Sequence, residues 1–285
     1  YAATPPFEAL RLIISIAATY DYDIMTNDVS RAYFYAPSVR RVFIKIPDED
    51  YEEGDDDMCA ELDFSMYGTR DAAHNWEIEY TNFLTSVGFN AGSASPCHFH
   101  HPSRGIDLVV HGDDFTSLGH ENDLAWLKAQ FEKKYEIKTN LLGPSHDSEI
   151  RVLNRILRWD GDTLSYEADP RHAELIIEDL DLKSAKPVNT PHIEVDSLQE
   201  SPELVGEQAT KYRAIVARAN FLAADRVDIQ YAVKEATRCM SKPRECDWQR
   251  LKRIGRYLLG SPKVILQFES QFQPTSLTVY FDSDF

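Results

Sequence analysis

The chain has 285 residues and 43% of them are hydrophobic, so it is long enough for about two domains with buried cores. Thirty basic residues against 47 acidic ones give a net charge of −17, whereas most nucleic-acid binders lean positive. The charge is uneven, because residues 1–145 carry 11 basic and 24 acidic side chains (−13) and residues 205–268 carry 13 and 6 (+7). The second half is therefore basic enough to offer a surface for phosphates.

Membrane spans, a signal sequence and disulfides are not expected. No apolar run is near the roughly 18 residues of a transmembrane helix, and the first residues have neither an initiator Met nor a basic-then-apolar signal. We therefore expect no membrane partner and interpret the chain as a piece of a longer polyprotein. Its four cysteines are widely spaced and form no Cys-x-x-Cys motif, which favours buried, reduced thiols in an intracellular protein.

An amphipathic helix and a strand are predicted at the start of the chain. Thr4 and Pro5 are typical of an N-cap followed by proline in the first helical position, and apolar residues keep helical spacing as far as Ala17. Residues 22–28 predict a strand that leads to the carboxylate of Asp28. We expect the helix to pack behind this strand.

A second strand and an acidic loop are predicted next. Phe34 is expected in the core, and residues 42–47 predict a strand that Pro47 ends. Most of residues 48–57 are acidic. Because nothing in the sequence fixes their geometry, we interpret them as a solvated loop rather than a metal site.

A helix of about 18 residues is predicted after Gly68, with Gly88 as its C-terminal cap. Its buried face is expected to consist of Ala72, Trp76, Phe83, Leu84 and Val87. Residues 95–101 then contain a cysteine and three histidines, which is compatible with zinc. A closed zinc site needs four fixed ligands, and neighbours on an extended chain face opposite sides, so a strand with Cys97 and Phe99 toward the core is favoured.

Residues 108–118 carry the pattern on which the functional interpretation depends. Apolar residues lead to a tight Gly112-Asp113-Asp114 turn, and apolar and polar residues alternate after it, as in a β-hairpin. A fold that holds two adjacent carboxylates close usually needs a cation, although an ordinary Asp-rich turn has the same local pattern. Asp28 favours the cation site over the ordinary turn. A strand that leads to an aspartate, then a helix, then a hairpin with two aspartates is the order of these elements along the chain of a polymerase palm. Three such carboxylates can hold two Mg²⁺ ions roughly 3.5–4 Å apart.

The rest of the chain is predicted to be mainly helical. The expected elements are a palm helix with Leu124, Leu127, Phe131 and Tyr135 buried, a hairpin over 150–168, a helix over 170–181, a linker over 183–205, and three helices over 206–260. The last helix is basic and amphipathic. Such a helix is either simply solvated or in contact with nucleic-acid phosphates.

Six segments along nearly the whole chain resemble the reverse transcriptase of Ty1/copia-type LTR retrotransposons. They are Asp-Val-Ser-Arg-Ala-Tyr-Phe (28–34), Tyr-Gly-Thr-Arg-Asp-Ala-Ala-His-Asn-Trp (67–76), His-Gly-Asp-Asp (111–114), Lys-Pro-Val-Asn-Thr-Pro (186–191), Tyr-Arg-Ala-Ile-Val (212–216) and Lys-Arg-Ile-Gly-Arg-Tyr-Leu-Leu-Gly (252–260). Each segment is weak evidence alone, but their order is that of the family.

The resemblance implies an RNA-directed DNA polymerase that uses two Mg²⁺ ions, or Mn²⁺ in their place. It assigns the catalytic and metal-binding roles to Asp28, Asp113 and Asp114, with Asp113 as the firmer ligand of the hairpin pair. One ion would activate a primer 3′-hydroxyl and the other would steady the triphosphate of a dNTP.

The resemblance also implies substrate-binding residues. Tyr33 takes the place of an aromatic ring that clashes with a ribose 2′-hydroxyl and so favours dNTP over NTP, unless it is simply packed in the core. Arg70 and Asp71 take the places of a lysine and a glutamine near template and dNTP. A carboxylate repels phosphates where an amide does not, and we expect Arg70 to offset it through a local pair. Nucleic-acid contacts are expected from the last basic helix, at Arg250, Lys252, Arg253 and Arg256.

The implied fold class is α+β, a right-hand polymerase. Residues 1–145 would form the palm and partial fingers, an antiparallel sheet with helices on one face, and residues 146–205 a hairpin, helix and linker. Residues 206–268 would form a helical thumb or connection. Residues 275–285 would begin an RNase H domain, with Asp282 as its first metal-binding carboxylate.

The implied partners are an RNA or DNA primer–template, dNTPs and the remaining Pol segments, namely integrase, the rest of the fingers and RNase H. The compartment would be a cytoplasmic virus-like particle or the nucleus. One alternative is a catalytically silent remnant of a retroelement that binds nucleic acid or protein, which Asp71 and the charge of −17 favour. Another is an unrelated Asp-based metal phosphohydrolase.

Overall fold

A computed structural model of the protein describes residues 3–55, 57–161, 163–193, 201–272, 275–276 and 278. The chain divides into two compact units. The first, here called the sheet unit, comprises residues 1–150, 158–164 and 268–285; the second, the helical unit, comprises residues 151–157 and 165–267. Within the described residues, no helix is both long and apolar enough to cross a membrane.

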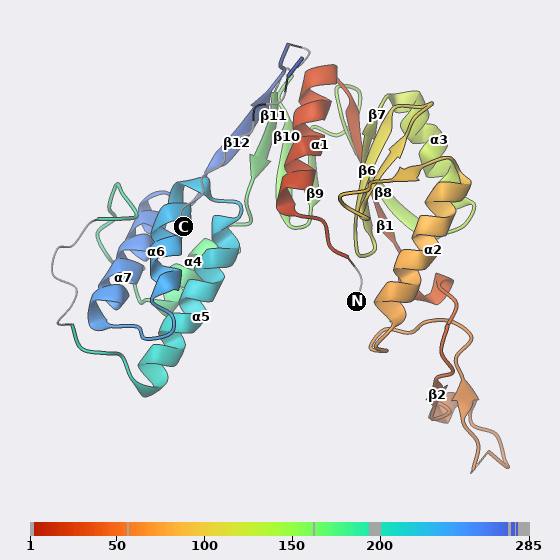
Figure 1. Ribbon diagram of the computed structural model, residues 1–285, viewed down its shortest axis with the longest axis horizontal. Coiled ribbons are helices and arrows are strands. Elements are labelled where there is room, and N and C mark those ends of the chain that lie inside the picture. The colour runs from red at the N-terminus through yellow and green to blue at the C-terminus, as the bar shows by residue number, and fades with distance from the viewer. Residues whose placement is uncertain are drawn as a thin grey trace. The chain divides into compact units, whose positions relative to one another are not determined.

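The sheet unit is built on antiparallel strands in the order β4-β5-β6-β7-β1-β8 (Figure 1). They are β1 (Asp23–Val29), β4 (Asn90–Ala91), β5 (His98–His101), β6 (Ile106–His111), β7 (Asp114–Gly119) and β8 (Ile137–Leu142). The predicted hairpin is confirmed as β6 and β7, and the predicted strand ending near Asp28 is confirmed as β1. Because β1 pairs with β7, the two stretches that suggested a palm lie side by side.

A smaller sheet follows β1 in the chain. It joins β2 (Phe43–Ile44) to β3 (Ala60–Glu61), and the turn η2 (Asp48–Asp50) lies in the acidic run between them. The strand predicted over residues 42–47 is therefore much shorter than expected. The side chains of η2 are exposed, as expected for a solvated loop.

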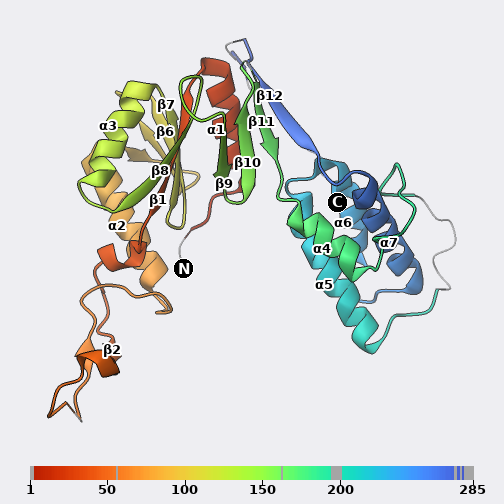
Figure 2. The ribbon, with the colours of Figure 1, turned by 180° about the vertical axis from the view of Figure 1, so that it is seen from behind.

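Helices cover both faces of the large sheet (Figures 1 and 2). On one face α2 (Ala72–Ser86) and α3 (Glu121–Glu132) enclose an aromatic core with Met25 and Phe115. On the other face α1 (Phe7–Tyr20) packs Ile13 against Val109 and Leu118. The expectation of helices on one face only was therefore wrong, because the interior strand β1 has buried residues on both faces and needs cover on each.

The predicted start of the first helix was also wrong. Pro6 occupies the N-cap position and α1 begins at Phe7, two residues later than a Thr4 cap would place it. Proline suits the position before the first helical residue because the N–H that it lacks is not needed there. The buried side chains of α1, including Ile13 and Ala17, keep the predicted spacing.

The helical unit contains α4 (Arg171–Asp179), α5 (Gly206–Ala223), η3 (Val227–Ile229), α6 (Gln230–Arg238) and α7 (Glu245–Gly260). Its core is apolar, and it includes the predicted residues of α5, namely Tyr212, Ile215, Val216, Ala219, Leu222 and Ala223. A second sheet has the order β12-β11-β10-β9, with β9 (Glu149–Val152), β10 (Arg155–Trp159), β11 (Thr163–Glu167) and β12 (Ile265–Glu269). Strands β10 and β11 confirm the hairpin predicted within residues 150–168.

A close approach to α7 fixes the segment that follows α4. A Cβ added to Gly255 would lie 2.7 Å from a methyl carbon of Leu182, and one added to Gly260 would lie 2.9 Å from Cβ of Pro187. Real side chains do not pack at these distances. The two glycines therefore let residues 182–187 lie directly on the helix.

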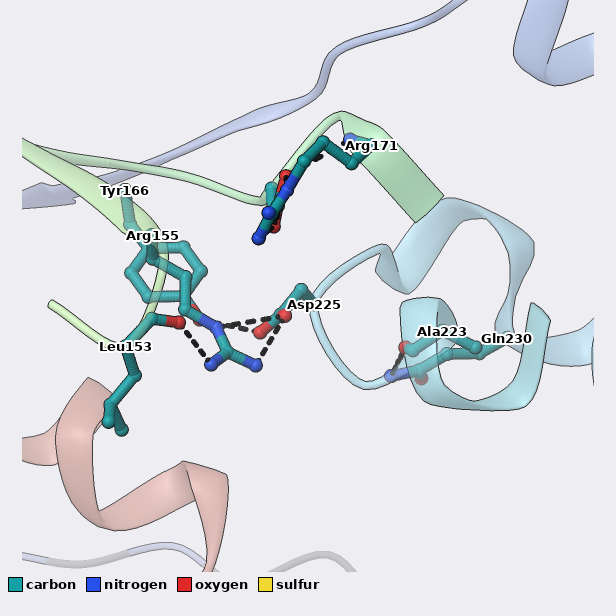
Figure 3. Close-up of polar contacts among 8 residues, drawn as sticks. Leu153, Arg155, Tyr166, Arg171, Ala223, Asp225 and Gln230 are labelled. Carbon is teal, nitrogen blue, oxygen red and sulfur yellow. Dashed lines mark hydrogen bonds and ion pairs between the residues drawn. The ribbon is translucent and has the colours of Figure 1, made fainter. Parts of the chain in front are cut away.

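A buried polar cluster joins β10 and β11 to the end of α5 (Figure 3). Arg155 donates from Nε and Nη2 to one carboxylate oxygen of Asp225 at 3.1 and 2.8 Å, and from Nη1 to the carbonyl of Leu153 at 2.7 Å. The hydroxyl of Tyr166 donates to the other carboxylate oxygen at 2.5 Å. Arg155 and Asp225 are 6% and 4% exposed, so each buried charge depends on the other.

We expect Asp225→Asn to lower the free energy of unfolding by about 3–5 kcal/mol, because it removes the negative charge that pairs with the buried guanidinium of Arg155. Tyr166→Phe should cost about 1.5–3 kcal/mol, since it removes one hydrogen bond to a charged group. Urea unfolding of the full chain, followed by circular dichroism, measures both. Arg171→Gln is the control, because the pair of Arg171 with Asp169 is exposed. If Asp225→Asn and Arg171→Gln lowered the free energy of unfolding equally, the buried cluster would not contribute more to stability than an exposed ion pair does.

Candidate active site

The β6–β7 turn brings three aspartates together. His111 pairs with Asp114 at the end of the hairpin, so Gly112 and Asp113 form a two-residue turn. Gly112 has a φ of 69°, a conformation that glycine adopts without a Cβ clash. Asp28 in β1 lies directly opposite Asp114. Opposed residues of antiparallel strands project on the same side with Cβ atoms about 4.5–5.5 Å apart, so Asp28 and Asp114 are neighbours on one face.

The paired carboxylates lie on the face of the sheet that α1 covers. Ile24 lies opposite Leu118, which packs against Ile13 of α1. Asp28 is four residues further along β1, or about 13 Å at the usual rise of a strand. Asp28 and Asp114 are half-buried there rather than enclosed. The side chains are thus held by the sheet and remain accessible.

Like charges meet at this end of the sheet. Burial raises the pKa of Asp114, and the charges of Asp113 and Asp28 raise it further, while His111 opposes them. Within the described residues, no three or more His, Cys, Asp or Glu side chains are placed so that together they could hold a metal ion. Mg²⁺ commonly binds through one or two carboxylates and completes its shell with water and phosphate oxygens. The oxygen donors present therefore fit Mg²⁺ or Mn²⁺, and they do not fit a metal that prefers sulfur or nitrogen.

Trp76 anchors the turn. Its indole Nε1 donates to the carbonyl of Gly112 at 2.8 Å, while the ring is 1% exposed and packs edge-on against Phe115 and Tyr135. The sequence predicted Trp76 only as a core residue. The missed signal was chemical, since a buried indole N–H needs an acceptor and the polar end of the hairpin offers one.

Tyr33 lies beside the hairpin in the short helix η1 (Ala32–Tyr35). Its ring is half-buried and contacts the ring of Tyr67, with centroids 4.3 Å apart. Phe34 is 45% exposed, so its predicted place in the core was wrong. Ala32 is the one buried side chain of η1. A 3₁₀ helix has three residues per turn, so the side chain of Phe34, two residues after Ala32, points in a different direction from it.

Asp71 has a partner that the sequence did not indicate. Arg40 donates to both of its carboxylate oxygens, from Nη2 at 3.0 Å and from Nε at 3.4 Å. These bonds lower the pKa of Asp71, against the effect of burial, and the charge of Arg70 contributes less. The prediction that Arg70 offsets the charge of Asp71 was therefore wrong about the main partner, which is Arg40. Arg40 is 31 residues away in the chain, so only the fold brings it to Asp71.

The basic residues of α7 mainly make contacts within the helical unit. Arg253 donates to the hydroxyl of Thr190 at 2.7 Å, Arg256 donates to the carbonyl of Lys186 at 2.7 Å, and Arg250 lies 3.5 Å from Asp247. Lys252 is half-buried. Arg253 and Arg256 thereby hold the segment that lies on the helix, and contact of α7 with nucleic-acid phosphates stays a prediction.

The remaining candidates are separated or lie outside the described residues. Cys97, Phe99 and His101 are buried, while His98 and His100 lie on the other side of β5, near Asp107. Because side chains alternate along the strand, the cysteine and histidines that could bind zinc are divided between its two faces. The burial also confirms that Cys97 and Phe99 face the core. Asp282 lies outside the described residues.

A family model described as "Reverse transcriptase (RNA-dependent DNA polymerase)" matches residues 2–194. The chain belongs to this family. The match includes β1, the β6–β7 hairpin and α2, and so Asp28, Asp113 and Asp114. It confirms the resemblance to the copia-type reverse transcriptases that the six motifs indicated.

Relatives of this reverse transcriptase segment include proteins of plant and yeast transposons. It is 27% identical to the retrovirus-related Pol polyprotein from transposon TNT 1-94 of Nicotiana tabacum, over 89% of this chain and 20% of that protein. It is 26% identical to the Pol polyprotein from transposon RE2 of Arabidopsis thaliana, over 97% of this chain and 19% of the relative. The putative transposon Ty5-1 protein of Saccharomyces cerevisiae is 26% identical over 90% of this chain and 82% of its own length. The chain thus spans about a fifth of the Pol polyproteins, and the alignments extend into the helical unit.

We expect Trp76→Phe to disturb the candidate turn. The variant keeps an aromatic ring but removes the donor to Gly112, and it should lower the free energy of unfolding by about 1–3 kcal/mol. The amide signals of Gly112 and Asp113 in NMR spectra should shift most. Trp126→Phe is the control, since Trp126 stacks on Arg104 away from the turn. Shifts spread evenly over the core would contradict a local anchor.

We also expect Arg40→Gln to raise the pKa of the Asp71 carboxyl toward its ordinary value of 3.8. The guanidinium stabilises the charged carboxylate, so its loss makes protonation easier and moves the titration to higher pH. NMR titration of the carboxyl carbon measures the change. Arg41→Gln is the matched control, because Arg41 pairs with Glu61. A larger rise in Arg70→Gln than in Arg40→Gln would reverse the assignment.

Proposed function

We propose that this segment is the polymerase core of an RNA-directed DNA polymerase that acts within a copia-type Pol polyprotein. The observation that carries the proposal is the register that places Asp28 against Asp114, beside Asp113, in a member of the reverse transcriptase family. Its substrates would be dNTPs and an RNA or DNA primer–template. The sheet unit would act as the palm with partial fingers, and the helical unit as the thumb or connection.

Asp28, Asp113 and Asp114 would hold two Mg²⁺ ions, with Asp113 as the firmer ligand of the hairpin pair. Bound there, the ions would activate a primer 3′-hydroxyl and neutralise charge on the triphosphate. The protein contributes the placement of the carboxylates through the β1–β7 register and the Trp76 anchor. Phosphoryl transfer needs little else from the protein besides such positioning and charge stabilisation.

The substrate-binding roles follow the same proposal. Tyr33, next to the hairpin, would meet the sugar of the incoming nucleotide. The Arg40–Asp71 pair removes the repulsion that a lone carboxylate would exert on phosphates, and it leaves Arg70 exposed as a positive group. Arg250, Lys252, Arg253 and Arg256 would add positive charge along the template, with only those donors that their own contacts leave free.

The second candidate is a catalytically silent remnant that binds nucleic acid or protein. Two observations favour it. The described residues hold no converged set of three metal ligands, and the net charge is −17. A remnant without this metal site would bind Mn²⁺ as strongly after Asp28 or Asp113 is replaced as before.

We expect the full chain to extend a DNA primer on an RNA template with Mg²⁺ or Mn²⁺. Asp28→Asn and Asp113→Asn should each reduce extension about 10³-fold or more, since each removes a metal ligand worth several kcal/mol. Asp50→Asn, in the exposed acidic loop, is the control and should be fully active. Binding of Mn²⁺, measured by paramagnetic resonance, should weaken in the first two variants only. Extension by Asp113→Asn, or Mn²⁺ binding that all four proteins share, would reject the assignment.

A further inference from the structure

Tyr67 connects the first motif of the site to the hairpin. Its ring lies 4.3 Å from that of Tyr33, centroid to centroid, at an interplanar angle of 32°. It also meets the ring of Phe34 edge-on at 5.9 Å. Tyr67, just before α2, thus contacts the rings of Tyr33 and Phe34 in η1, while the ring of Tyr35 packs against Tyr135.

The hydroxyl of Tyr67 makes hydrogen bonds with the backbone of Tyr33 and Ala32. Burial and then the charge of Asp113 raise the pKa of this phenol, and those hydrogen bonds oppose the rise. Tyr67 as a whole is 46% exposed.

The turn that carries Tyr67 is itself fixed. Thr69 donates from both its backbone N–H and its hydroxyl to the carbonyl of Met66, at 3.1 and 2.8 Å. Gly68 has a φ of 92°, which a residue with a side chain adopts only under strain. Behind the turn, the amide of Asn75 donates to the hydroxyl of buried Ser65 at 2.9 Å. The position of Tyr67 is thus determined by the fold and not by chance packing on a mobile loop.

We propose that Tyr67 is the positioning residue that holds the Tyr33 ring in place, so that it sets the preference for dNTP over NTP. The inference rests on the proposed polymerase function. A ring excludes a 2′-hydroxyl only if it cannot turn aside, because an unsupported aromatic side chain reaches another rotamer at small cost. Tyr33 lies in a four-residue 3₁₀ helix with one buried residue, so its own element gives it little support. Tyr67 supplies that support through ring contact.

The ring and the hydroxyl of Tyr67 can be tested separately. Tyr67→Phe keeps the ring and removes the hydroxyl, whereas Tyr67→Leu removes the aromatic face. In primer extension by the full chain, Tyr67→Leu should lower the ratio of kcat/KM for dTTP over UTP about tenfold. The change should come mainly from faster use of UTP, while use of dTTP falls less than about threefold. Tyr67→Phe should keep the ratio within about twofold.

A double variant distinguishes positioning from a structural role. The fall in the ratio of kcat/KM for dTTP over UTP in Tyr33→Ala measures the complete loss of sugar selection. The double variant Tyr33→Ala with Tyr67→Leu should show the same fall and no more, because both changes act through the Tyr33 ring. Phe34→Ala is a matched control, since it removes the other ring that meets Tyr67 and leaves the Tyr33 contact intact. Tyr231→Leu, an exposed tyrosine of the helical unit, controls for general effects. Additive losses, or an unchanged ratio in Tyr67→Leu, would overturn the proposal.

A second measurement does not depend on activity. In aromatic NMR spectra of the full chain, the signals of the Tyr33 ring should shift and broaden in Tyr67→Leu and stay in place in Tyr67→Phe. Unchanged Tyr33 signals in Tyr67→Leu would reject the positioning role, whatever the polymerase assay shows. If the wild-type chain extends no primer while the Tyr33 ring does respond, the polymerase proposal fails and the contact itself stands.

Discussion

The pairing of β1 with β7 is the constraint on which the candidate site depends. Side chains alternate along a strand, so a shift of one residue would move Asp28 to the opposite face of the sheet from Asp114. The apolar residues of β1 prevent that shift, because Met25 faces the aromatic core under α2 and α3 while Ile24 pairs with Leu118 on the α1 side. A strand with two buried faces accepts only one register. The acidic end of the sheet is therefore positioned by hydrophobic burial several residues away.

Among the described residues, some charges are compensated by a nearby partner, whereas the carboxylates at the β6–β7 turn repel one another. Arg40 neutralises Asp71, Arg155 neutralises Asp225, and the arginines of α7 are engaged with their own unit. At the hairpin, by contrast, burial and neighbouring carboxylates both raise the pKa of Asp114. Retained repulsion between carboxylates is typical of sites that bind cations. The acidity of the first half of the sequence therefore has a structural counterpart at the end of the large sheet that carries Asp28 and Asp114.

The sequence predicted those features that depend on local pattern. The alternation after Gly112, the strand before Asp28 and the spacing of Tyr212, Ile215 and Val216 each report which faces are buried, and each was confirmed. Features that depend on residues far apart in the chain were missed. Arg40 could not be assigned to Asp71, nor Trp76 to the carbonyl of Gly112, because neither pattern indicates a partner. The exposure of Phe34 was missed since a four-residue 3₁₀ turn has no periodicity to read.

The close packing of residues 182–187 on α7 has an evolutionary consequence. Two of the motifs that signalled the family, Lys186–Pro191 and Lys252–Gly260 in this chain, are two sides of one contact, joined by Gly260 and the bonds of Arg253 and Arg256. A residue with a side chain at Gly260 would collide with Pro187, so neither motif could drift freely without the other. The pair should thus be inherited as a single unit, and divergence in this part of related chains should take the form of coupled substitutions across the contact.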